Sequence, residues 1–90
     1  MEVTTDIPAD RVYEYGYPIT EAEIREKMAR RGIEGELARV AYDCVGRTGR
    51  PMRLMGWGIV AGGEVVSVCR ATRSNALKWE TSDVRYWRMA

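Results

Sequence analysis

The chain of 90 residues contains no histidine and no phenylalanine, and it has only two cysteines and two lysines. Histidine is the usual general base near neutral pH and a common metal ligand, so its absence argues against acid–base catalysis and against a zinc site. The carboxylates show no spacing typical of a catalytic pair, and no nucleophile motif occurs. We therefore expect that the protein is not an enzyme and that it uses no cofactor and no metal.

Long apolar runs are missing as well. The longest uncharged stretch covers 54–63, and four of its ten residues are glycine. A membrane-spanning helix needs roughly 20 apolar residues. Two aspartates and a proline interrupt the first ten residues, which is unlike a secretion signal. These absences predict a cytoplasmic protein with no membrane partner, in which Cys44 and Cys69 stay reduced and unpaired.

Arginine is abundant, and the charges are divided between the two halves of the sequence. Residues 1–45 contain ten acidic and six basic side chains, a net charge of −4. Residues 46–90 contain three acidic and eight basic side chains, a net charge of +5, together with all three tryptophans. Arginines interleaved with large aromatic residues favour binding of a polyanion or of an acidic protein surface. The second half therefore contains the candidate binding residues.

The clearest local signal is a helix over about 21–31. Thr20 is a good N-cap, and Glu23 three residues later completes a capping box. Acidic residues precede basic ones by four positions along the segment, which adds stabilising pairs on the helix surface. Gly32 supplies the left-handed residue that commonly ends a helix.

A second helix is predicted between this one and Gly46. Apolar side chains recur there at the i, i+3, i+4 and i+7 positions of an amphipathic helix. They are Leu37, Val40, Ala41, Cys44 and Val45. The β-branched residues and Tyr42 in the same segment leave a strand as the alternative. Two adjacent helices could also suggest DNA reading, but Glu34 and Glu36 would repel phosphates. We favour two helices that cover one side of a sheet.

Alternating patterns predict the strands. Over residues 11–17 the alternation places three tyrosines on one face, and we expect at least two of them in the core. Gly62-Gly63 divides residues 54–72 into two alternating runs and predicts a hairpin in which Ile59 faces Val66.

The end of the chain is less clearly patterned. The runs 76–81 and 84–89 favour a last hairpin around Ser82-Asp83, with a C-terminal helix over 76–89 as the alternative. In the hairpin, Trp87 lies on the polar face between arginines, whereas the other two tryptophans fall on apolar faces and belong to the core.

Together these elements predict an α+β fold with two short helices packed on an antiparallel sheet of four to five strands. A single domain accounts for all 90 residues. Residues 1–10 are expected to form a loosely ordered N-terminal tail.

Six side chains of the basic half make up the predicted partner-binding set. They are Arg47, Arg50, Arg53, Arg85, Trp87 and Arg88. The first three belong to a loop rich in glycine and arginine, which either holds an anion or is a solvated connection. An exposed tryptophan among arginines has the composition of a binding hot spot.

The predicted function is that of a non-catalytic interaction protein that binds an acidic protein surface through this basic, tryptophan-bearing half. An inhibitor, adaptor or regulator fits this description, and a phage-type inhibitor of a bacterial defence complex is one setting. Two alternatives stay open. One is direct nucleic-acid binding, with all basic side chains on one face. The other is binding of a small anionic nucleotide, often by a homo-oligomer with pockets at its interfaces.

Overall fold

The computed structural model describes residues 7–90, which have an α+β fold with one α-helix, two 3-10 turns and a six-stranded sheet. The elements in chain order are η1 (Ala9–Arg11), β1 (Val12–Glu14), α1 (Glu21–Arg31), β2 (Glu36–Val45), β3 (Pro51–Ala61), β4 (Glu64–Ala71), β5 (Leu77–Glu80), η2 (Val84–Tyr86) and β6 (Trp87–Met89). The sheet has more strands, and the described chain fewer helices, than the sequence predicts. Of the predicted tail, residues 1–6 lie outside the described residues, and the 3-10 turn η1 follows them.

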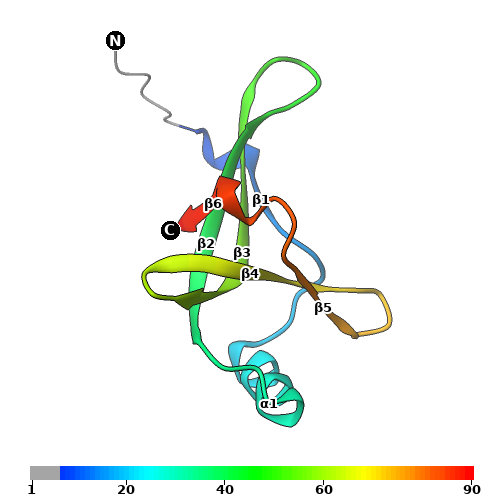
Figure 1. Cartoon of the computed structure of the whole chain (residues 1–90). Coiled ribbons are helices and arrows are strands. Elements are labelled where there is room, and N and C mark those ends of the chain that lie inside the picture. Colours follow the sequence, from blue (N-terminus) through cyan, green and yellow to red (C-terminus); the bar gives the residue numbers. More distant parts are fainter. Residues whose placement is uncertain (1–6) are drawn as a thin grey trace.

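The sheet is strongly curved. Its strand order is β5-β4-β3-β2-β6, with β1 beside β3, and every pair except β1–β3 is antiparallel. Although β4 and β6 are separated in this order, β4 lies against both η2 and β6. The sheet therefore has an inner, concave face and an outer face. Figure 1 shows α1 at one end of the molecule and the turn between β2 and β3 at the opposite end.

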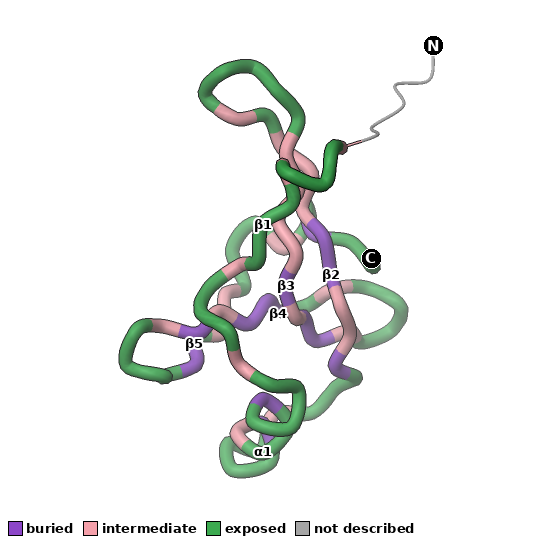
Figure 2. Tube along the Cα trace, turned by 180° about the vertical axis from the view of Figure 1, so that it is seen from behind, coloured by how far each residue is buried: buried purple, intermediate pink, exposed green. Residues whose placement is uncertain are grey.

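Each face of the sheet has its own hydrophobic core. The outer core consists of Ile24 and Met28 of α1 packed on Leu37, Ile59, Cys69, Ala71 and Leu77. The inner core consists of Val40, Val68 and Trp87, with Tyr15, Tyr42, Leu54, Val65 and Val84 packed around them. Figure 2 shows the buried residues gathered where β2, β3 and β4 cross, whereas the far end of the β2–β3 hairpin is largely exposed.

The predicted first helix is confirmed as α1, Glu21–Arg31. The Thr20 side chain accepts a hydrogen bond from the backbone N–H of Glu23 at 3.2 Å, as a capping box requires. Gly32 has φ 66°, and the Ile33 N–H donates to the Met28 carbonyl at 3.0 Å. Both capping signals in the sequence are therefore used in the structure.

The predicted second helix is wrong, because residues 36–45 form the strand β2. β2 is an interior strand that pairs with β3 along its whole length and with β6 on its other edge. Val40 packs in the inner core, whereas Leu37 packs in the outer core. A strand buried on both faces does not alternate strictly between apolar and polar residues, so its pattern is compatible with a helical period.

The hairpin around Gly62-Gly63 is confirmed. Its predicted register holds beside the turn, where Val60 pairs with Val65, but it is wrong by one residue from Ile59 onward. Ile59 pairs with Ser67 instead of Val66, and a β-bulge follows at the next position of β3. A bulge leaves one residue of a strand without a partner. Here it places Val66 on the exposed surface.

The predicted last hairpin does not form, and neither does the alternative helix over 76–89. β5 pairs with β4 at one end of the strand order, and the chain then crosses to the other end, where η2 leads into β6 beside β2. The expected tyrosine strand is also shorter, since β1 ends at Glu14. The expectation of two buried tyrosines is wrong, because Tyr13 and Tyr17 are exposed and only Tyr15 packs against the inner core.

Candidate functional site

The β2–β3 hairpin extends beyond the rest of the sheet as an arm, which we define as residues 43–53 (Figure 1). The backbone closes the turn at its tip, where the Gly46 N–H donates to the Arg50 carbonyl at 2.9 Å. Arg47 and Arg50 are both exposed there. Within residues 7–90 neither side chain forms a hydrogen bond or an ion pair, so both guanidinium groups are available to a partner.

At the base of the arm, one carboxylate binds two arginines on the outer face of the sheet. Arg53 donates from Nε and Nη2 to the two oxygens of Asp43, at 2.6 and 3.1 Å. Arg88 of β6 lies 3.4 Å from the same carboxylate. The hydrogen bonds from Arg53 hold the pKa of Asp43 below its ordinary value. Because the Asp43 side chain is 13% exposed and that of Arg88 is 70% exposed, Arg88 can turn toward a second anion.

Trp87 is not on the surface, which corrects the prediction of an exposed hot-spot residue. It is 8% exposed and belongs to the inner core. Its ring lies 5.1 Å from that of Tyr15 and 5.5 Å from that of Tyr42, measured between centroids. A Cβ atom at Gly56 would lie 3.4 Å from the Trp87 ring, about ordinary contact distance, so the indole packs closely over the backbone of this glycine. Trp87 therefore positions β6, and little more than one edge of its indole ring is accessible to a partner.

The exposed aromatic residue beside it is Tyr86. The Arg85 guanidinium lies 4.8 Å from the centroid of the Tyr86 ring and donates to its hydroxyl at 3.0 Å. Tyr86 is 48% exposed. An arginine stacked on an exposed tyrosine is a common element of protein interfaces, so Tyr86 takes the place that the sequence suggested for Trp87.

A groove runs between η2–β6 and the turn that joins β3 to β4. Its volume is about 640 Å³. The lining residues are Gly63, Glu64, Val65, Val84, Arg85, Trp87, Arg88 and Met89. We call it the seam groove, because it lies where the curved sheet fails to close. Three of the six predicted binding residues thus meet at one concave site, with apolar side chains between them.

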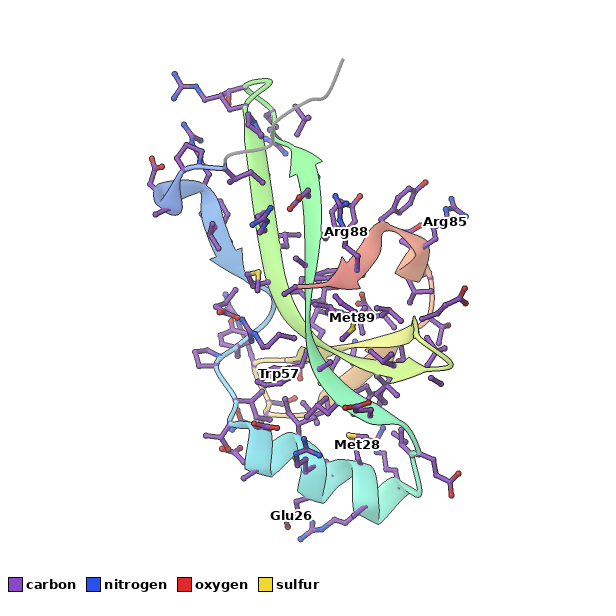
Figure 3. All side chains as sticks on the ribbon, turned by 90° about the vertical axis from the view of Figure 1, so that its left-hand side faces the viewer. Glu26, Met28, Trp57, Arg85, Arg88 and Met89 are labelled. Carbon is purple, nitrogen blue, oxygen red and sulfur yellow. The ribbon has the colours of Figure 1, made fainter. Side chains whose placement is uncertain are left out.

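The structure places the predicted arginines in the half of the molecule away from α1, although not in one cluster. We call Arg47, Arg50, Arg53, Arg85 and Arg88 the arginine surface. Figure 3 shows Arg85 and Arg88 on the side that carries β6, away from α1, where Glu26 lies. The charge division in the sequence is not kept in space, because Asp43 of the acidic half lies between Arg53 and Arg88.

Sequence reasoning missed a second cavity, of about 370 Å³, between the start of α1 and β3. There the Arg39 guanidinium lies 5.0 Å from the centroid of the Trp57 ring, and its Nη2 donates to Glu14 at 2.8 Å. Arg39 lies opposite Trp57 because the two residues are partners in the β2–β3 register. Only a correct assignment of β2 as a strand could have revealed it.

The two cysteines are unpaired, as predicted. Cys69 belongs to the outer core, and burial raises the pKa of its thiol to about 11. A protonated, buried thiol is a poor nucleophile. Within residues 7–90 no group of three or more histidine, cysteine or carboxylate side chains is arranged to hold a metal ion.

No family model matches the chain, and neither a curated protein nor a solved structure shows significant similarity to it. Among residues 7–90, no helix combines the length and the apolar character that crossing a bilayer requires.

Proposed function

We propose that this protein is a non-catalytic interaction protein that binds an acidic surface of another protein through its arginine surface. The observation that carries the proposal is the mixture of arginines and exposed apolar side chains in the half of the molecule away from α1. Val45 is 69% exposed, Met89 53% and Tyr86 48%. Arginine, methionine and tyrosine are enriched in the centres of protein interfaces, and an acidic partner would complement the charge.

An acidic protein fits this surface better than a nucleic acid does. Phosphates gain little from contact with Val45 or Met89, whereas a protein partner buries them with a favourable hydrophobic contribution. Asp43 also places a carboxylate between Arg53 and Arg88. A protein surface that binds nucleic acid, by contrast, places its cations so that each can neutralise a phosphate.

The proposed role is that of an inhibitor, adaptor or regulator that works by occupying a partner's surface. A small inhibitor of a larger complex, such as a phage protein directed against a bacterial defence assembly, is one such setting. The described residues offer a binding surface rather than a walled reaction site, and this supports a non-catalytic role.

The test is affinity capture from a lysate of the source organism, with and without nuclease. Wild-type protein is compared with the double variant Arg85→Glu, Arg88→Glu and with the control Glu21→Lys, Glu26→Lys on α1. We expect a nuclease-resistant acidic protein that binds the wild type and the control, and whose affinity for the arginine variant is at least about tenfold weaker.

Melting curves must first show that both variants are folded. Binding that disappears with nuclease would mean that the partner is a nucleic acid. Loss of binding in the helix variant alone would place the interface on α1 and overturn the proposal.

A further inference from the structure

The C-terminal strand β6 has a free edge that faces the seam groove. β6 pairs with β2 on one side only, and the Ala90 N–H donates to the Arg39 carbonyl at 3.1 Å. In an antiparallel pair, the backbone groups of alternate residues point toward the partner strand and away from it. Since the N–H of Ala90 points toward β2, the backbone N–H and C=O groups of Met89 and Trp87 point away from β2. The Trp87 N–H is satisfied by the Val84 carbonyl.

Met89 keeps both of its backbone groups free. By this alternation neither its N–H nor its C=O faces β2, no other backbone pairing within residues 7–90 involves Met89, and the residue is 53% exposed. The opposite wall of the groove is also an unpaired edge, because β5 pairs only with Val68–Ala71 and leaves the first half of β4 without a neighbour on that side. Exposed strand edges of this kind bind extended segments of other chains by strand addition.

The side chains of β6 determine which sequence could be added. Trp87 and Met89 alternate with Arg88, so they lie on the inner face of the sheet and Arg88 lies on the outer face. Residues of an added strand follow the same alternation. Those on the inner side would meet Val65 and Val84 as well as Trp87, and those on the outer side would lie beside Arg88.

The charged side chains that line the groove indicate which charge the outer residues of an added strand should carry. Arg88 and Arg85 line the groove on the β6 side, and Glu64 is the one carboxylate that lines it. Arg53 already occupies both oxygens of Asp43, whereas Arg88 has a single longer contact with it. A carboxylate on the added strand would therefore find Arg88 available. Figure 3 shows Arg85, Arg88 and Met89 on one side of the molecule, beside the β3–β4 turn.

We infer that β6 binds an extended segment of a partner protein in which apolar and acidic residues alternate, by adding it as a strand along the free edge of β6 at the mouth of the seam groove. This inference rests on the proposed function and specifies how the acidic partner is held. Backbone hydrogen bonds to Met89 would supply part of the affinity, and the alternating side chains would supply the specificity.

The test is titration of the 15N-labelled protein, followed by NMR, with the synthetic peptide acetyl-Glu-Val-Glu-Val-Glu-Val-Glu-amide. We expect saturable shifts of the Arg88, Met89 and Val65 amide signals. The same peptide with lysine for glutamate, and the same peptide with alternate backbone nitrogens methylated, should each bind at least about tenfold more weakly. Methylation removes the backbone donors but keeps the charge, so it separates strand addition from simple ion pairing.

Two variants locate the site. Arg85→Glu with Arg88→Glu should weaken binding of the acidic peptide at least about tenfold, whereas the matched charge change Arg30→Glu with Arg31→Glu, at two exposed residues of α1, should leave it unaltered. Met89→Pro should abolish binding while keeping the melting temperature, because the N–H that it removes points away from β2.

Equal binding of the methylated peptide, equal binding of the lysine peptide, or no saturable shift at millimolar peptide would overturn the inference. Preference for a single-stranded oligonucleotide over the peptide would do so too. These results are separate from the capture experiment. A captured partner that depends on Arg85 and Arg88, together with peptide failure, refutes strand addition and leaves the proposed function standing. Absence of any captured partner refutes the proposed function itself.

Discussion

Asp43 holds the arm to β6, because it is the one carboxylate that both Arg53 and Arg88 contact. Hydrogen bonds from Arg53 lower its pKa in the folded state. A carboxyl whose folded pKa is below its unfolded value of about 3.9 stabilises the fold above that pH. This stability is lost as the pH falls through the folded pKa. We therefore predict that the free energy of unfolding of the wild type falls in this acid range, and that Asp43→Asn makes the fall shallower.

The measurement is urea unfolding at a series of acid pH values. Asp83→Asn is the control, since Asp83 is exposed, has no ion pair among residues 7–90, and adopts a left-handed conformation that asparagine tolerates. If Asp43→Asn and wild type lose stability in parallel, the contact with Arg53 contributes nothing to the acid sensitivity of the fold.

Trp87 shows what composition reveals at the scale of a residue and what it does not. Its position between Arg85 and Arg88 correctly indicates the place where arginines surround a concave site. The indole itself is buried against Gly56 and Tyr15, two residues far away in the sequence. A local alternation pattern cannot show that the polar face of one strand becomes the inner face of a curved sheet.

At the scale of elements, α1 depends on its N-cap. The Thr20 hydroxyl satisfies the Glu23 N–H at the start of the helix, where no intrahelical acceptor exists. We predict that Thr20→Ala lowers the free energy of unfolding by about 1 kcal/mol. Thr20→Asp should keep most of the stability, because a carboxylate also accepts from the backbone at a helix start. Denaturant melts followed by circular dichroism check both variants, and an unaltered melt for Thr20→Ala would mean that the helix does not rely on this cap.

Elements defined by local signals could be predicted, and elements defined by distant pairing could not. The cap, the surface ion pairs and the terminal glycine of α1 all lie within 20–32, so the sequence contains the whole argument. β2 was predicted as a helix because its two buried faces remove the alternation that identifies a strand. β6 has three residues, and its partner is β2, far back in the chain. Nothing within 84–89 indicates that pairing.

The same distinction applies to the candidate site. Five of the six predicted residues are exposed or partly exposed arginines of the arginine surface, since abundant arginine is readable from composition. Tyr86 and Met89 were missed as surface residues, and the seam groove could not be foreseen, because both follow from the crossing of the chain between β5 and β6.

At the scale of the whole molecule, the two cores lie on opposite faces of the same strands. β2, β3 and β4 contribute to both, so loss of either core should expose the other. We predict one cooperative unfolding transition, in which Ile24→Val in the outer core and Trp87→Phe in the inner core each shift all signals together. Ile24 is fully buried, and its change should cost about 1 kcal/mol. Trp87→Phe should also destabilise, since it removes part of a ring that fills the inner core.

The check is urea unfolding followed by far-ultraviolet circular dichroism, which reports on α1, and by tryptophan fluorescence. Trp57 and Trp79 pack on the outer core and remain in both variants. Coincident transitions with equal midpoints are the signature of two-state unfolding. If Trp87→Phe moved the fluorescence transition and left the helix signal in place, the two cores would be independent. In that case β6 could detach from the sheet while α1 stays folded, and the seam groove would not be a fixed site.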